Sequence, residues 1–283
     1  MELKATVYGV EFIPVGKIIY YLDNGEGIKV GDLVLVVGEF GLEVAKVVIG
    51  PKEVGIEDVG YDLKAVVRRL TKEDLEIYKK NLEDAVKARY VFRQMVKRHG
   101  LPMKLVYVKY TFDRSRLIFF FSSETRVDFR ELVKDLAKEF KTRIELRQVG
   151  ARDELKMMGG LGLCGRPTCC SVFLREFKSV KLELARKQQM MINPAKISGT
   201  CRRLLCCLTY EHDFYERELK DIPDEGSTIE YEGKTCKVIN VNVFLQEVTV
   251  VSEDREMIKI SFDYFKNKTK KGDRLIGIRA DDI

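Results

Sequence analysis

The pattern of apolar and polar positions near the start of the chain is typical of short β-strands. Between residues 3 and 48, β-branched and aromatic runs alternate with glycine turns. Residues 38–41 are expected to form a hairpin turn between two of these strands. Short strands joined by tight turns predict a small antiparallel β-barrel, which we assign to residues 1–61.

A helical period follows the predicted barrel. Thr71 and Asp74 have the spacing of a helix N-terminal cap, and the Gly-Leu-Pro at residues 100–102 is expected to end the helix. Between these limits, apolar side chains recur at helical spacing: Leu75, Tyr78, Leu82, Ala85, Phe92 and Val96. A hairpin of two strands, a helix and a third strand are then predicted at residues 104–110, 116–121, 128–140 and 143–148. The order α-β-β-α-β predicts a compact α+β layer over residues 62–153.

The pattern changes again after residue 153. A glycine-rich run at residues 156–162 leads into a cysteine cluster, and we assign residues 154–215 to a cysteine-rich, metal-binding segment. Apolar residues at steps of three and four predict an amphipathic helix that ends before Pro194: Phe173, Phe177, Val180, Leu184 and Met191.

Alternating β character returns over residues 226–251, with a turn expected at residues 232–234. Further strands at residues 258–260 and 275–278 would complete a C-terminal β-unit over residues 216–283. The fold class predicted from these patterns is therefore α+β and multidomain.

Composition narrows the class of protein. The 283 residues are 45% hydrophobic and 33% charged, a globular mixture rather than a disordered one. A net charge of +6 is a mild bias, short of the strongly basic balance of many nucleic-acid binders. The first residues do not resemble a secretion signal, and no apolar run reaches the roughly 18 residues that a membrane span requires. We therefore expect a cytoplasmic protein without direct membrane insertion.

Six of the seven cysteines form a short internal repeat of the type Cys-x4-Cys-Cys, in which Arg166 aligns with Arg203. In a reducing compartment such thiols are expected to bind metal rather than to form lasting disulfides. Thiolates are soft ligands that suit zinc or iron–sulfur clusters. The predicted metal and cofactor ligands are Cys164, Cys169, Cys170, Cys201, Cys206 and Cys207.

Spacing alone leaves the choice between zinc and an iron–sulfur cluster open. Six thiols are too few for two complete four-cysteine clusters, so either some cysteines are spare or other subunits complete the set. Several of the six could instead be buried small hydrophobes, because free cysteine is among the most buried residue types. The isolated Cys236 is expected to be structural.

Two other functions remain as alternatives. A cysteine hydrolase would need a histidine base, for which His212 is a candidate, although a solvated position is the simpler expectation for that residue. Possible RNA contact is suggested by the basic residues 266–271, which follow Tyr264 and Phe265, since single-strand binders pair cations with stacking aromatics. The sequence therefore favours a protein that is not an enzyme, with a zinc-stabilised RNA-binding protein as the alternative.

Particular residues resemble a known family. The features in question are the first cysteine motif, Gln188, residues 191–194, residues 196–199, and the second cysteine motif with the Tyr210 and Glu211 that follow it. Together they resemble the RicT (YaaT) family of bacterial stage 0 sporulation and RNA-processing regulators. Residues 62–153 are similar to the C-terminal domain of a yeast polymerase-suppressor protein.

This resemblance implies a non-catalytic adaptor subunit of a Ric-type complex. In such a complex the chain would carry 4Fe-4S clusters, with its six motif cysteines as ligands and other subunits completing the set. It would associate with RicA-like and RicF-like small helical proteins and modulate RNA processing by RNase Y. The family has glycine after the first cysteine of the second motif, where this chain has Arg202. Since glycine permits a positive φ, we expect Arg202 to alter the geometry around Cys201.

Overall fold

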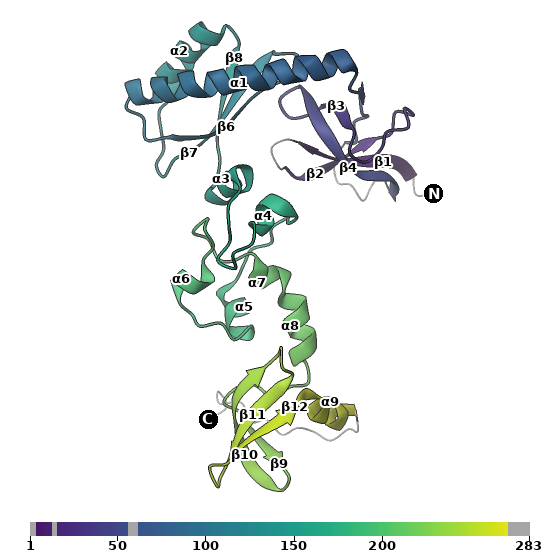
Figure 1. The fold of residues 1–283 in the computed structure, drawn as a ribbon, viewed down its shortest axis with the longest axis vertical. Coiled ribbons are helices and arrows are strands. Elements are labelled where there is room, and N and C mark those ends of the chain that lie inside the picture. The colour runs from purple at the N-terminus through teal and green to yellow at the C-terminus, as the bar shows by residue number, and fades with distance from the viewer. Residues whose placement is uncertain (1–3, 13–15, 56–61, 271–283) are drawn as a thin grey trace. The chain divides into compact units, whose positions relative to one another are not determined.

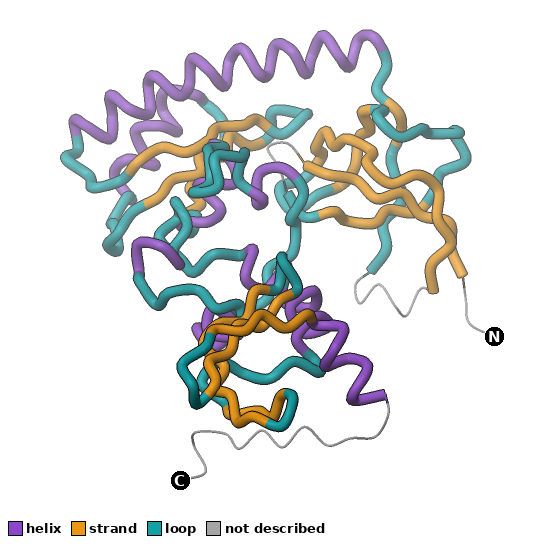
Figure 2. Tube along the Cα trace, turned by 60° about the horizontal axis from the view of Figure 1, so that its bottom comes forward, coloured by secondary structure: helices purple, strands orange, loops and turns teal. Residues whose placement is uncertain are grey.

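The computed structural model describes residues 4–12, 16–55 and 62–270, which form a mixed α+β protein with several sheets (Figure 1). The chain divides into two compact units. Unit 1 comprises residues 1–177 together with residues 198–203, and unit 2 comprises residues 178–197 and 204–283. Strands are gathered into three sheets, two in unit 1 and one in unit 2 (Figure 2).

The N-terminal part of unit 1 is an antiparallel five-stranded sheet with the order β2-β1-β4-β3-β5. Its strands are β1 (Lys4–Phe12), β2 (Ile18–Leu22), β3 (Leu33–Val37), β4 (Leu42–Gly55) and β5 (Arg68–Arg69). Alternate side chains bury a small core: Tyr8, Val10, Tyr21, Ile28, Val34, Val36, Ala45, Val47 and Val66. The expected turn at residues 38–41 is confirmed, because the Gly38 amide donates to the Gly41 carbonyl at 2.8 Å.

The predicted closed barrel is wrong for the described residues. The two edge strands of the sheet, β2 and β5, do not pair with each other there. Instead the segment just before β5 meets β2 through one isolated bridge, Leu22 to Ala65. Strand β5 has only two residues, too few for the ladder of hydrogen bonds that closure requires.

The central part of unit 1 has the predicted order of elements. These are α1 (Lys72–Arg98), β6 (Lys104–Tyr110), β7 (Arg116–Ser122), α2 (Arg130–Phe140) and β8 (Arg143–Gln148). Strand β7 is central, antiparallel to β6 and parallel to β8, so α2 is a crossover helix. Both helices contribute to one core, in which Phe92 of α1 stacks on Phe119 of β7 with ring centroids 4.6 Å apart.

The start of α1 confirms the predicted cap. The Asp74 amide donates to the Thr71 hydroxyl at 3.2 Å, and the Thr71 amide donates to the Asp74 carboxylate at 2.9 Å. Arg68 forms a hydrogen-bonded ion pair with the Asp74 carboxylate, and this pair lowers the pKa of the Asp74 carboxyl group from 3.8 to about 2. One buried carboxylate therefore joins β5 to the first turn of α1.

A buried ion pair joins the two sheets of unit 1. Lys109 of β6 donates to Glu43 of β4, and both side chains are largely withdrawn from water. The Lys109 ammonium also lies 5.9, 5.2 and 5.9 Å from the ring centroids of Phe12, Phe40 and Phe120, respectively, close enough for cation–π attraction. The pair is thus desolvated on one side by aromatic rings.

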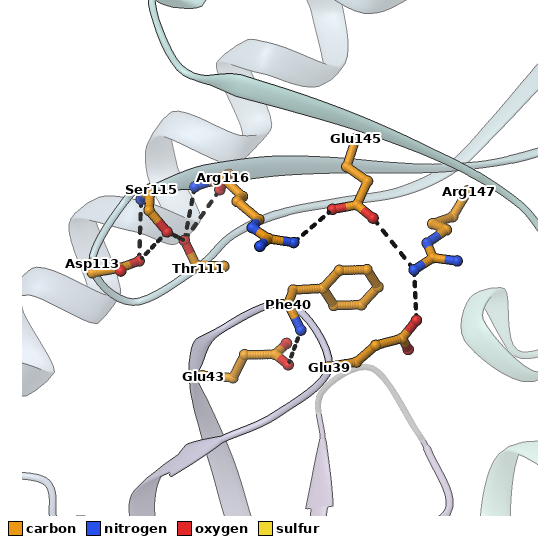
Figure 3. Close-up of polar contacts among 9 residues, drawn as sticks. All are labelled: Glu39, Phe40, Glu43, Thr111, Asp113, Ser115, Arg116, Glu145 and Arg147. Carbon is orange, nitrogen blue, oxygen red and sulfur yellow. Dashed lines mark hydrogen bonds and ion pairs between the residues drawn. The ribbon is translucent and has the colours of Figure 1, made fainter.

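Further charged residues surround Phe40, which lies in the turn between β3 and β4 (Figure 3). Arg147 of β8 donates to Glu39 at 2.6 Å and contacts Glu145 at 3.3 Å, while its guanidinium lies 5.1 Å from the Phe40 ring centroid. Glu145 in turn accepts from Arg116 at 3.3 Å. The turn at residues 38–41 is therefore held on the three-stranded sheet.

Two short helices, α3 (Ala151–Met158) and α4 (Cys169–Val172), complete unit 1. Unit 2 contains the helices α5 (Leu182–Lys187), α6 (Pro194–Ile197), α7 (Cys207–Tyr210), α8 (His212–Leu219) and α9 (Phe262–Lys270). Its antiparallel sheet has the order β12-β11-β10-β9, formed by β9 (Thr228–Tyr231), β10 (Lys234–Asn242), β11 (Glu247–Ser252) and β12 (Met257–Ser261). The predicted turn is confirmed at Glu232 and Gly233, with φ of 50° and 76°. The expected strand at residues 275–278 lies outside the described residues.

The single amphipathic helix predicted from Phe173 to Met191 is wrong. Only residues 182–187 of that stretch form the helix α5. Phe177 packs in unit 1, where the Arg152 guanidinium lies 4.6 Å from its ring centroid, whereas Leu184 belongs to a core in unit 2. Because the regularly spaced apolar residues serve two cores, they do not share one helix face.

No helix in the described ranges combines the length and the apolar character needed to cross a membrane.

We predict that Lys109→Met destabilises unit 1 by roughly 3 kcal/mol, because Glu43 would remain buried without a counter-charge. Urea unfolding followed by circular dichroism measures this change. Lys134→Met is the control, since it removes an exposed pair with Glu131 that should contribute less than about 1 kcal/mol. Equal effects of the two substitutions would contradict a structural role for the buried pair.

We also predict a pH-dependent contribution from Asp74. A carboxylate whose pKa falls on folding stabilises the protein above its ordinary pKa of 3.8, and this stabilisation is lost as the pH falls toward about 2. Asp74→Asn should therefore lower the melting temperature at pH 7, with the difference from the parent shrinking as the pH falls through about 2. Asp128→Asn, which removes an exposed pair with Arg130, should have little effect at either pH.

Candidate metal-binding cysteine hairpins

The first cysteine motif begins with a tight hairpin. The Gly162 amide donates to the Arg166 carbonyl at 2.8 Å, and the Gly165 amide donates back to the Gly162 carbonyl at 3.0 Å. Cys164 is thus the third residue of a four-residue turn, which exposes its side chain. Below the turn, the Thr168 amide donates to the Gly160 carbonyl at 3.0 Å, and the chain enters α4 at Cys169.

The second motif forms the same backbone hydrogen bonds. The Gly199 amide donates to the Arg203 carbonyl at 2.8 Å, and the Arg202 amide donates to the Gly199 carbonyl at 2.8 Å. The Leu205 amide donates to the Ile197 carbonyl at 2.9 Å, the counterpart of the bond from Thr168. The repeat seen in the cysteine spacing is therefore a repeat of local structure, and we call the two copies the cysteine hairpins (residues 160–173 and 197–210).

We expected the side chain of Arg202 to alter the geometry around Cys201, but the backbone of the second hairpin at this position matches that of the first. Its φ is 60°, close to the φ of 75° at Gly165, the equivalent position of the first hairpin. The left-handed conformation is required because this residue follows the turn and its amide bonds back to Gly199. The hydrogen bonds of the hairpin therefore outweigh the strain that a side chain brings to this conformation.

The six motif thiols differ in exposure. Cys164 is exposed, Cys170 is buried, and the other four are half-buried. Cys236 is fully buried in the core of the unit 2 sheet, where burial raises the pKa of its thiol, as suits a structural residue.

Whether these residues fit a metal depends on chemistry and on placement. The donors are chemically suitable, since thiolates bind zinc and iron–sulfur clusters. Their placement is not yet that of a site: within the described residues, no three His, Cys, Asp or Glu side chains are grouped so that they could hold a metal ion. Cys164, Cys169, Cys170 and Cys201 belong to unit 1, and Cys206 and Cys207 to unit 2.

A group of cations beside the first hairpin was missed by the sequence analysis. Lys156 of α3 is buried, and its pKa is lowered by desolvation and by the nearby Arg175, while Asp153, Glu11 and, least of all, Cys170 act in the opposite direction. Arg175 pairs with Glu11 at 2.9 Å, but its Nη1 atom is buried without a hydrogen-bond partner, as is the Nε atom of Arg152. The only signal in the sequence is the four-residue spacing of Arg152 and Lys156.

The alternatives gain little from the structure. His212 is half-buried rather than solvated as expected, with a buried Nδ1 atom that has no hydrogen-bond partner. Phe265 is fully buried, and Tyr264 is half-buried against the same core. Lys266 is paired with Glu218 at 3.1 Å.

A cavity of about 720 Å³ lies in unit 1 between the end of β8 and the N-terminus of α3. Cys201 and Arg202 of the second hairpin line it, together with Lys104 and Glu154, which form an ion pair at 2.8 Å.

Comparison with known proteins identifies the family. The chain is 46% identical over 252 residues to stage 0 sporulation protein YaaT of Bacillus subtilis. The aligned region covers 89% of this chain and 92% of that protein. The chain belongs to the YaaT family. Within it, residues 64–149 match the model of the PSP1 C-terminal conserved region, and residues 179–222 match that of the third domain of PSP1-like proteins.

Other relatives share smaller parts with this YaaT-family chain. An uncharacterized protein of Schizosaccharomyces pombe is 35% identical over 81 residues, which is 29% of the chain and 11% of that protein. Protein PSP1 of Saccharomyces cerevisiae is 46% identical over 46 residues, or 16% of the chain and 6% of that protein. No solved structure matches the chain significantly.

We predict that Arg202→Gly stabilises the second hairpin by about 1 kcal/mol, because glycine adopts the left-handed conformation without strain. The measurement is the free energy of unfolding from urea titration. Arg202→Ala is the control: it also removes the exposed contact with Glu124 at 3.5 Å but keeps the backbone strain, so it should not stabilise. Equal stabilities of the glycine and alanine variants would contradict this explanation.

Proposed function

We propose that this YaaT-family chain is a non-catalytic, iron–sulfur adaptor that modulates RNase Y-dependent RNA processing as part of a Ric-type complex. The observation that carries the proposal is the structural repeat: two hairpins with the same hydrogen bonds present the same Cys-x4-Cys-Cys set of thiols. A duplicated scaffold for soft ligands supports metal binding more strongly than cysteine spacing alone, since buried core cysteines do not require a shared turn.

In this proposal the protein ligands of 4Fe-4S clusters come from Cys164, Cys169, Cys170, Cys201, Cys206 and Cys207. Six thiols exceed the four that one cluster takes and fall short of the eight that two take, so partner subunits would complete the set. A cluster bound to thiolates carries negative charge and would add a second link between the two hairpins, which are already joined where the Thr200 hydroxyl donates to the Leu161 carbonyl at 3.0 Å. The buried Lys156 lies near the Cys170 sulfur and places a cation beside the first hairpin. Because the described arrangement does not gather three ligands, ligation is expected to require a shift of the hairpins that brings their thiols together.

The partners in this proposal are RicA-like and RicF-like small helical proteins and RNase Y. Exposed apolar side chains on and beside the first hairpin support a docking role, namely Leu161, Leu163, Val172 and Phe173. Apolar side chains grouped on a surface are typical of protein interfaces. Metal binding that shifts the hairpins would therefore also shift the surface that a partner contacts.

Anaerobic purification followed by iron, sulfide and zinc analysis tests the proposal, with the chain alone and after co-expression with candidate partners. We expect a brown protein with matching iron and sulfide, and loss of both metal and partner binding in Cys164→Ser and Cys201→Ser. Cys236→Ala is the matched control, because this buried thiol belongs to the sheet core and should leave the metal content unchanged.

Stoichiometric zinc in a colourless protein, with and without partners, would overturn the iron–sulfur assignment. If such a protein also bound RNA with a steep salt dependence, the zinc-stabilised RNA-binding alternative would take its place. Retention of metal and partners by both serine variants would refute the role of the hairpins.

A further inference from the structure

Helix α1 has an exposed apolar stripe along one flank, about a third of a turn round the helix from its buried face. Its inner face buries Ala85, Ala88, Phe92 and Val96 against the central sheet. On this flank, Leu82, Val86 and Tyr90 follow one another at four-residue steps and are 39%, 63% and 66% exposed. Residues four apart are neighbours on a helix surface, so these three side chains form a continuous ridge.

The stripe is not explained by the needs of the helix itself. Valine and tyrosine are weaker helix formers than alanine, lysine or glutamate, each costing up to about 0.7 kcal/mol at an exposed helical position. The capping box at Thr71 already fixes the start of α1, and the inner face supplies its packing. A rigid helix of 27 residues that keeps an apolar ridge in water therefore has the features of a protein-docking surface.

The charge around the stripe indicates what would bind there. From Ala85 to Gly100 the sequence contains five Lys or Arg residues and no Asp or Glu. Arg93 and Lys97 are exposed on the same side as Tyr90, one and two turns further along, and neither has a carboxylate partner within the described ranges. Basic residues in the last turn of a helix are favoured by its dipole, but this effect does not reach Arg93 or account for the apolar ridge.

We propose that the exposed flank of α1 docks an acidic amphipathic helix of a partner protein. Apolar residues of that helix would pack along Leu82, Val86 and Tyr90, and its Asp or Glu side chains would pair with Arg93 and Lys97. A protein helix fits better than nucleic acid, because aliphatic side chains offer RNA nothing and Tyr90 is the only aromatic ring on the stripe. A second copy of this chain would bring the same basic segment into the interface, which like-charge repulsion disfavours.

None of the motif cysteines belongs to this face, so the proposal goes beyond the metal-dependent function and can be tested apart from it. The test places a photo-crosslinking amino acid at Val86 of the full chain, in the cells that make it, and maps the crosslinked peptide by mass spectrometry. The control position is Ile77, which is 44% exposed on the same helix but lies two and a half turns away, on the other side. We expect crosslinks from position 86 to a partner segment with apolar residues at helical spacing and acidic flanks, and few from position 77.

A synthetic peptide of the mapped segment then gives the affinity. Arg93→Glu with Lys97→Glu should weaken binding about tenfold, the combined effect of two exposed charge pairs. Cys164→Ser should leave it unchanged even if metal is lost, which separates this surface from the proposed function. Crosslinks to RNA or to a second copy, equal yields at positions 86 and 77, no crosslink at position 86, or an affinity that is insensitive to the charge reversal would each overturn the proposal.

Discussion

The buried pair of Glu43 and Lys109 is the interaction on which the architecture of unit 1 depends. It joins two sheets that have separate cores, and three phenylalanine rings shield the ammonium from water. A charge pair in such surroundings is favourable only when its partners are correctly placed. The two sheets therefore have one defined arrangement, to which the turn around Phe40 and the charges at Arg147 add further contacts.

Unit 1 carries the two surfaces on which the proposals rest. The exposed stripe of α1 and the first cysteine hairpin belong to the same unit but to different elements, one a long capped helix and the other a glycine-rich turn. The helix presents its side chains without rearrangement, whereas the hairpins do not gather three ligands in the described arrangement. A preformed docking face and a metal-dependent face would give an adaptor one constant contact and one conditional contact.

Local features of the fold could be predicted from the sequence, and those that depend on distant residues could not. The cap at Thr71 and the hairpin turn at Glu232 each rest on neighbouring residues, and both were found. The pairing of Glu43 with Lys109 joins residues 66 apart, for which one sequence carries no signal. The failed helix at Phe173 shows the same limit, because regular spacing cannot reveal that its apolar residues serve two cores. In the candidate site, the cysteine repeat was visible, but the buried cations at Lys156 and Arg175 were not.

The division of the chain has a consequence for how the protein can be taken apart. The backbone passes between the two units at three places, after residues 177, 197 and 203. No single truncation point therefore separates the two units. A fragment that ends at residue 177 lacks the segment that contains Cys201, and one that ends at residue 203 keeps residues 178–197 of unit 2. Each unit is interrupted in sequence by part of the other. We therefore expect genetic exchange between relatives to transfer the whole cysteine region together with the segments on both sides of it, or to leave that region uncut.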